Sequence, residues 1–355
     1  MWDTNLTKLT ISVNQKQTII IPAKHVLLTD EALYYLLLVN LWGPAQAVCV
    51  LGIITNILNI IVFSKQGVRD TVNISLLGLA TSDLGSLITV LYINISFMPD
   101  FTALDLPFVG RDVMYILSWC HVIFTRVSTW ITAYITLERC LCVTAPLKVK
   151  NLFTPRRTVF YLFFVYVFML TSVCPVFYTS RAARIFDSSN NRTLLGISFL
   201  EDRDKIERVA FMTNNTVPTL AFCTVAICTA ILVSTLRKKS KWRRKATTST
   251  AKTVVADRDG KVVKMVVLIS TIFIICYFPG AAVFVVMLLD TDLRIDGFQK
   301  NMLIAIFSIL FHLESINASV NIFIYLSMSS KFRLTFKNMM CFKCNKQSGC
   351  KKQNK

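Results

Sequence analysis

Seven long apolar stretches, each with few charged residues, constrain this chain more than any other feature of its sequence. About 20 consecutive apolar residues are enough to cross the hydrocarbon core of a bilayer as a helix. Seven such crossings account for a hydrophobic content of 54% and a mean hydropathy of +0.55, and this balance excludes an ordinary soluble enzyme. The stretches lie at residues 40–63, 71–98, 112–142, 157–180, 208–236, 264–289 and 301–327.

The predicted fold is an all-α membrane protein, a bundle of seven transmembrane helices followed by a short amphipathic helix. Residues 1–30 lack the basic start and apolar core of a cleaved signal, and we expect residues 1–39 to form an N-terminal segment outside the membrane. Residues 40–327 would form the transmembrane domain. Residues 328–355 would form the amphipathic helix and a cytoplasmic tail.

The distribution of basic residues orients the chain. Of the 39 Lys and Arg residues, 26 lie on one side of the predicted membrane, 12 on the other, and Arg126 lies within it. Because the more basic side is normally cytoplasmic, we expect a multi-pass plasma-membrane protein with an extracellular N-terminus. The net charge of +19 then lies in loops, which does not favour nucleic-acid binding. Two glycosylation sequons, at Asn5 and Asn191, fall in outer segments.

Several polar residues lie inside the apolar stretches, where we expect each to have a polar partner within the bundle or a functional role. An ionisable group at mid-membrane costs about 2.5–3.5 kcal/mol on insertion scales. Asp83 is such a residue in the second stretch. In the third stretch polar residues recur at helical spacing and so share one face of a helix, which must point into the bundle. They are His121, Thr125, Ser128, Thr132 and Arg139.

Six short motifs occur in order along the chain. They are Gly52-x-x-x-Asn56, Leu79-Ala80-x-x-Asp83, Glu138-Arg139-Cys140, Pro218, Phe273-x-x-Cys276-Tyr277-Phe278-Pro279 and Asn321-x-x-x-Tyr325. Any one is weak evidence, but six in this order are strong. On these motifs the chain, from about residue 45 to residue 340, resembles rhodopsin-like (class A) G-protein-coupled receptors. Stretches such as ITLERCLCV and ESINASVNIFIYLSMSSKFR are similar to chemosensory receptors of gastropod molluscs.

The resemblance implies a receptor that binds an extracellular ligand and activates a heterotrimeric G-protein, with no catalytic residues and no cofactor. Arg139 would be its switch, held by Glu138 and Asp259 until the sixth helix swings outward. Tyr325 would belong to the same switch. A charge pair among lipid headgroups is the alternative interpretation. The residues implied as the activation hinge are Pro218, Phe273 and Pro279.

The resemblance also implies a polar network around Asp83. Ser128, Asn317 and Asn321 match positions that bind a sodium ion in the inactive state of the family, and Asn56 belongs to the same network. A set of oxygen ligands with one carboxylate suits a hard cation. A hydrogen-bonded cluster with water and no ion would suit the same residues.

The chain departs from the family at one covalent bond. A disulfide usually joins the outer end of the third helix to the following outer loop, but Met114 occupies the expected position and residues 181–212 contain no cysteine. Cys120 lies six residues deeper, about 9 Å along a helix, and is a poor substitute. We therefore expect no disulfide.

Ligand contacts in the family come from the outer halves of the third, fifth, sixth and seventh helices. Arg126 and Glu314 are a buried cation and a buried anion at similar depth, so we expect them to pair, or a ligand carboxylate to complete the pair. A structural ion pair, or an arginine extending into a polar cavity, is the alternative. The candidate pocket residues are His121, Thr125, Arg126, Asn214, Asn215, Tyr277, Phe284, Phe311, Glu314 and Ser315.

The outer segment before the fifth stretch carries charges of both signs at residues 201–208, which we interpret mainly as a solvated loop. A small polar ligand, such as an amino acid, would suit this segment, so we expect a receptor for a chemosensory cue. A neuropeptide receptor of the same fold is the alternative. A membrane transporter is a distant alternative, which substrate uptake into vesicles without a G-protein would identify.

The C-terminal segment predicts contact with membrane lipid. Basic and apolar residues alternate after Tyr325 as in a helix lying along a membrane, and Cys341 and Cys344 follow. Cysteines beside such a helix are candidates for palmitoylation. With Cys350 they would make an incomplete zinc site, because no histidine lies nearby.

Overall fold

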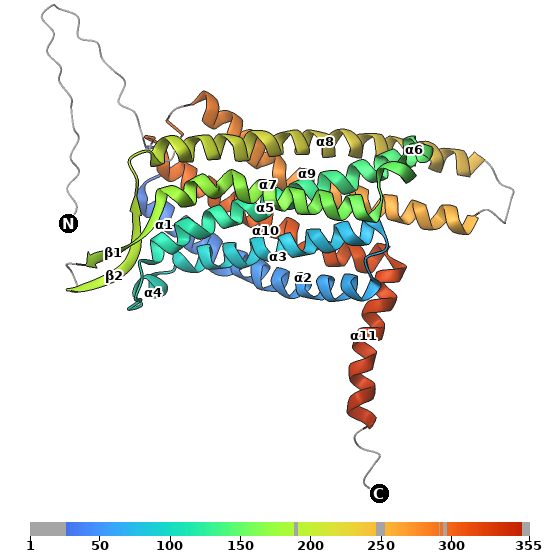
Figure 1. Ribbon diagram of the computed structural model, residues 1–355, viewed down its shortest axis with the longest axis horizontal. Helices are drawn as coiled ribbons and strands as arrows, with labels where there is room; N and C mark the ends of the chain where they lie inside the picture. Colours follow the sequence, from blue (N-terminus) through green and yellow to red (C-terminus); the bar gives the residue numbers. More distant parts are fainter. Residues whose placement is uncertain (1–25, 188–190, 246–252, 291, 294–296, 350–355) are drawn as a thin grey trace, which may run out of the picture.

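Seven long helical segments lie side by side in the computed structural model and form an elongated bundle (Figure 1). The structure describes residues 26–187, 191–245, 253–290, 292–293 and 297–349. The elements are α1 (Asp30–Asn40), η1 (Leu41–Ala45), α2 (Gln46–Gln66), α3 (Thr71–Ser96), α4 (Pro99–Thr102), α5 (Gly110–Thr144), α6 (Pro146–Leu152), α7 (Pro155–Thr179), β1 (Ser180–Asp187), β2 (Arg192–Phe199), α8 (Arg203–Lys245), α9 (Thr253–Leu289), α10 (Lys300–Met328) and α11 (Ser330–Gly349).

Local sequence sets the ends of several helices. The Asp70 carboxylate accepts a hydrogen bond from the first turn of α3, and Thr154 caps α7, whose first residue is Pro155. Gly67 ends α2 with a φ of 83°, a conformation that costs glycine little. The first segment runs without a break from α1 through η1, a π-helical turn that contains Pro44, into α2.

Six of the described segments are long and apolar enough to cross a membrane, and their outward faces carry large apolar side chains. On α7, for example, Phe160 and Phe163 are 70% and 66% exposed. A water-soluble surface rarely presents apolar patches of this extent, whereas acyl chains would cover them. The chain is therefore a multi-pass membrane protein.

The seventh long helix, α5, has 35 residues but is too polar to count among these six segments. It packs against α3, α7, α8 and α9, so its polar residues face other helices rather than lipid. His121 and Ser128 are buried, as the helical spacing predicts. With α5 at its centre, the all-α bundle has the seven helices expected from the sequence.

The two ends of the bundle differ (Figure 1). One end carries α4 and an antiparallel hairpin of β1 and β2, in which Ser180 pairs with Phe199 and Asp187 with Arg192. The other carries α6 and the start of α11, which extends away from the bundle axis. The hairpin and the start of α8 at Arg203 correct the interpretation of this outer segment as a solvated loop. We call the first end the hairpin end.

Candidate functional site

A cavity with a volume of about 390 Å³ lies toward the hairpin end of the bundle. This volume falls within the range of about 300–1,000 Å³ that small-molecule sites occupy. Residues of α1, η1, α3, α5, α8, α9 and α10 line it. Nine of the ten candidate pocket residues are among them: His121, Thr125, Arg126, Asn214, Asn215, Tyr277, Phe284, Phe311 and Glu314.

Ser315, the tenth candidate, does not line the cavity. Its hydroxyl faces α2, where it accepts a hydrogen bond from the thiol of Cys49 at 3.6 Å. It therefore joins α10 to α2.

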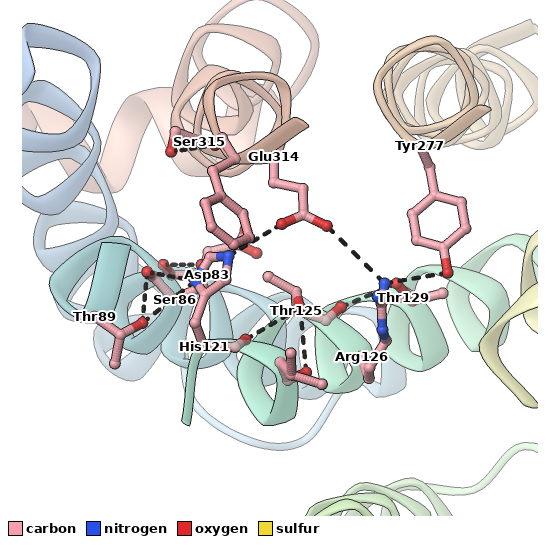
Figure 2. A network of polar contacts seen from close by, with 12 residues as sticks. Asp83, Ser86, Thr89, His121, Thr125, Arg126, Thr129, Tyr277, Glu314 and Ser315 are labelled. Carbon is pink, nitrogen blue, oxygen red and sulfur yellow. Dashed lines mark hydrogen bonds and ion pairs between the residues drawn. The ribbon is translucent and has the colours of Figure 1, made fainter. Parts of the chain in front are cut away.

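Three ionisable side chains from two helices meet at the deep end of this cavity (Figure 2). Glu314 on α10 lies between His121 and Arg126, both on α5. Its Oε2 is 3.0 Å from His121 Nε2, whereas its Oε1 is 3.9 Å from Arg126 Nη1, beyond hydrogen-bonding distance. The carboxylate is therefore bonded to the histidine and only loosely paired with the arginine.

The other ring nitrogen of His121 faces α3. Nδ1 lies 3.1 Å from the carbonyl oxygen of Ser86 and 3.3 Å from the hydroxyl of Thr89. The first contact needs a proton on Nδ1, whereas an unprotonated Nδ1 can accept from the hydroxyl, so both tautomers fit these contacts. In each of them one oxygen of Glu314 contacts His121 and the other lies toward Arg126.

Arg126 has few partners for a buried guanidinium group. Nη1 donates to the hydroxyl of Tyr277 and Nη2 donates to Oδ1 of Asn215, both at 3.2 Å. Its Nε is buried and has no partner among the described residues. A guanidinium carries five N–H groups, so several remain available beside the cavity.

A second polar cluster lies at the rim of the cavity, where sequence reasoning had placed solvated residues. The Tyr115 hydroxyl donates to Glu207 at 2.6 Å, and Arg203 pairs with Glu207 within the first turns of α8. The Arg203 guanidinium lies 3.7 Å from the centre of the Phe199 ring. The spacing of Arg203 and Glu207 by four residues was the available signal for a helix face.

A smaller cavity of about 30 Å³ adjoins Asp83. Ser128 donates to Oδ1 of Asp83 at 2.7 Å and Asn321 donates to Oδ2 at 2.9 Å, so one carboxylate joins α3, α5 and α10. Asn317 lines the cavity, and Glu314 lines both this cavity and the larger one. Oxygen atoms around a space of this size fit one water molecule or one small hard cation.

Asn56 lies apart from this cluster. Its Nδ2 donates to the backbone oxygens of Gly52 and Ala318, each at 2.9 Å. It therefore joins α2 to the backbone of α10 and makes no hydrogen bond to Asp83.

At the opposite end of the bundle, Glu138 holds Arg139 as expected, with Nη2 donating to Oε1 at 2.7 Å. The hydroxyl of Thr71 donates to the same oxygen. Asp259 lies within α9, but its side chain is outside the described part of the structure. Tyr325 is 1% exposed, and its ring packs against Phe63 and Phe332.

The hinge residues lie within long helices, Pro218 in α8 and Pro279 in α9. Phe273 stacks on Tyr277 with ring centres 5.3 Å apart, and Phe222 of α8 stacks on Tyr277 at 5.4 Å. The floor of the ligand cavity is thus in direct contact with the aromatic residues between α8 and α9.

Of the predicted modification sites, only Asn191 is described in full. It is exposed at the turn between β1 and β2. Asn5 lies outside the described residues, as do the side chains of Cys341 and Cys344. No disulfide joins the cysteines that the structure describes.

Comparisons with known proteins agree on the class of protein. The chain is 25% identical over 293 residues to the QRFP-like peptide receptor of Branchiostoma floridae, an alignment that covers 81% of this chain and 74% of that receptor. It is 24% identical over 306 residues to the allatostatin-A receptor of Bombyx mori, covering 82% and 76%. It is 28% identical over 181 residues to the galanin-like G-protein coupled receptor npr-9 of Caenorhabditis elegans, covering 47% and 39%.

The sequence model of one family matches residues 45–343, most of the chain, and its description is "Serpentine type 7TM GPCR chemoreceptor Srw". These relatives are receptors and not enzymes. The narrower resemblance to chemosensory receptors of gastropod molluscs stays a prediction. The chain therefore belongs to the Srw family of serpentine seven-transmembrane G-protein-coupled chemoreceptors.

Proposed function

We propose that the chain is a plasma-membrane receptor whose hairpin end faces the outside, and that its extracellular ligand binds in the 390 Å³ cavity. The effect of ligand binding would be transmitted to a heterotrimeric G-protein at the Arg139 end of the bundle. The helix α5 would transmit it, since it carries both Arg126 and Arg139. The excess of Lys and Arg in the segments on the Arg139 side supports this orientation.

The incomplete pairing of Arg126 carries the proposal for ligand chemistry. Its hydrogen-bond partners Tyr277 and Asn215 are neutral, and Glu314 is 3.9 Å away and makes its closer contact, at 3.0 Å, with His121. A buried cation with spare N–H groups is stabilised by an anion or a polarised oxygen. The ligand would therefore present a carboxylate, or a strongly accepting carbonyl oxygen, to Arg126.

The walls above this polar end are mostly apolar, and Phe211, Phe284, Phe307 and Phe311 contribute to them. A ligand that is polar throughout would leave these walls without apolar contacts. We infer a small molecule with an apolar body and one acidic or carbonyl end. A chemosensory cue of this kind agrees with the chemoreceptor family that the chain matches.

A peptide ligand is the second candidate, because one of the similar receptors is described as a "QRFP-like peptide receptor". The C-terminal residue of a peptide could place an apolar side chain against the aromatic walls and its terminal oxygens on Arg126. The hairpin end would then contact the rest of the peptide.

The test is a G-protein activation screen in cells, with aromatic amino acids, aryl carboxylic acids and short peptides, each also as its methyl ester. We expect acids to activate, and Arg126→Met to weaken them about 10- to 100-fold, since hydrogen bonds to charged groups contribute about 1.5–3 kcal/mol. Arg126→Lys, which keeps the charge, is the matched control and should lose less. Acid potency that is equal in Arg126→Met and the wild type, at equal surface expression, would contradict the proposal.

A further inference from the structure

The hairpin is attached to the outer end of α5 at a point where this chain has no disulfide. The backbone N–H of Leu195 donates to the carbonyl of Pro107 at 3.1 Å, and its own carbonyl accepts from the N–H of Val109 at 2.9 Å. The Asp112 carboxylate, on the first turn of α5, accepts a hydrogen bond from the N–H of Ile197 at 2.7 Å. Three hydrogen bonds thus join β2 to α5 and the segment before it.

Gly196 lies between Leu195 and Ile197, the two β2 residues that make these hydrogen bonds. A Cβ atom at this position would lie 2.8 Å from Oδ2 of Asp112, closer than real Cβ contacts, and would also meet the side chain of Ile185. Only a residue without a side chain lets the carboxylate approach the backbone of β2 this closely. The Asp112 carboxylate therefore occupies the space that a side chain at position 196 would need.

The attachment leads directly to the rim of the ligand cavity. Two residues after Ile197, the ring of Phe199 packs edge-on against Tyr115 at 5.4 Å and covers the guanidinium of Arg203. Both Tyr115 and Arg203 line the cavity. Tyr115 is three residues after Asp112, so the two lie on one face of α5. The position of β2 thus determines the position of the rim.

We propose that Asp112 and Gly196 form a non-covalent clamp that fixes the hairpin over the ligand cavity, in place of the disulfide found in related receptors. Asp112 acts as a positioning residue, because it holds β2 through a charge-assisted hydrogen bond to the Ile197 N–H. The clamp needs no thiol. Its effect on ligand potency rests on the proposed function, but its effect on the hairpin does not.

Hydrogen exchange of the full-length receptor in lipid nanodiscs measures the clamp without a ligand. Asp112→Ala should speed exchange of the Leu195 and Ile197 amides about tenfold or more, the scale expected when a hydrogen bond to a charged group is lost. Asp112→Asn keeps an accepting oxygen and should restore most of the protection. Asp202→Ala is the matched control, since it removes a largely exposed carboxylate that pairs with Lys205 and makes no ion pair with either strand.

Unchanged exchange of these amides in Asp112→Ala would overturn the clamp, and so would faster exchange of the wild-type hairpin after dithiothreitol. In the acid screen, Asp112→Ala should lower acid potency and Asp112→Asn should recover it. A loosened hairpin with unchanged potency would overturn the part of the proposal that concerns the cavity. Failure of the Arg126 prediction would instead remove the proposed function, and the exchange result would still decide the clamp.

Discussion

Ser270 of α9 and Thr136 of α5 join these two helices by a hydrogen bond of 2.7 Å between their buried hydroxyl groups. The Thr136 hydroxyl donates its one hydrogen to the backbone carbonyl of Thr132, one turn earlier on α5. The Ser270 hydroxyl is therefore the donor in the bond between the two helices. The resemblance to class A receptors implies that α9 swings outward on activation. This bond would have to break during that movement.

We therefore predict that Ser270→Ala raises ligand-independent G-protein signalling. A net hydrogen bond contributes about 0.5–1.5 kcal/mol, which corresponds to a rise of roughly two- to tenfold. The measurement is basal nucleotide exchange on the G-protein at equal surface expression. Thr271→Val is the matched control, because the hydroxyl of Thr271 is exposed and bonds only to the backbone of its own helix. Equal basal signalling in both variants would contradict the prediction.

The helices of the bundle could be predicted from sequence because long apolar stretches alternate with polar segments, but the degree to which each helix faces lipid or other helices could not. Hydropathy alone finds six spans and misses α5, whose polar residues face neighbouring helices; ordered motifs such as Glu138-Arg139-Cys140 identify it. Asp83, Arg126 and Glu314 were predictable as interior residues, because a charge within an apolar stretch needs a partner.

The hairpin and the cavity rim could not be predicted in the same way. Residues 181–207 carry charges of both signs, a composition that suits solvated loops and structured segments alike. Arg203 lies partly covered by the Phe199 ring because β1 and β2 pair across the turn at Asn191, and this pairing leaves little signal in the sequence around Arg203. The cavity's charged rim therefore depends on tertiary packing.

At the scale of helices, α3, α5 and α10 meet at Asp83, and we propose that a sodium ion stabilises this junction. In the wild type, sodium should raise the melting temperature above that in choline at matched ionic strength. A shift of about 2–4 °C is expected for each kcal/mol of binding free energy. Asp83→Asn removes the charge and should abolish the difference in melting temperature between sodium and choline. Glu138→Gln, which changes a carboxylate near the Arg139 end of α5, should retain this difference. An equal sodium effect in Asp83→Asn would mean that this junction holds no ion.

For the whole molecule, α5 runs from the wall of the larger cavity to the predicted switch residue Arg139. Arg126 and Arg139 are thirteen residues apart on α5, about 20 Å along its axis. Glu314 lines both the larger cavity and the small cavity beside Asp83. A ligand that draws Arg126 away from Glu314 would therefore change the electrostatic environment of Asp83. This change would pass inward only if the hairpin end is extracellular.

Glycosylation tests that orientation. The sequon Asn191-Arg192-Thr193 begins at an exposed turn of the hairpin, where an oligosaccharyltransferase has access if this end enters the lumen during synthesis. We predict that glycosidase treatment increases the gel mobility of the receptor, and that Asn191→Gln and Thr193→Ala each abolish one part of this shift. Asn214 begins a further sequon but is 2% exposed within the bundle, so Asn214→Gln should leave the shift unchanged. A wild-type receptor whose gel mobility does not change on glycosidase treatment would contradict this orientation.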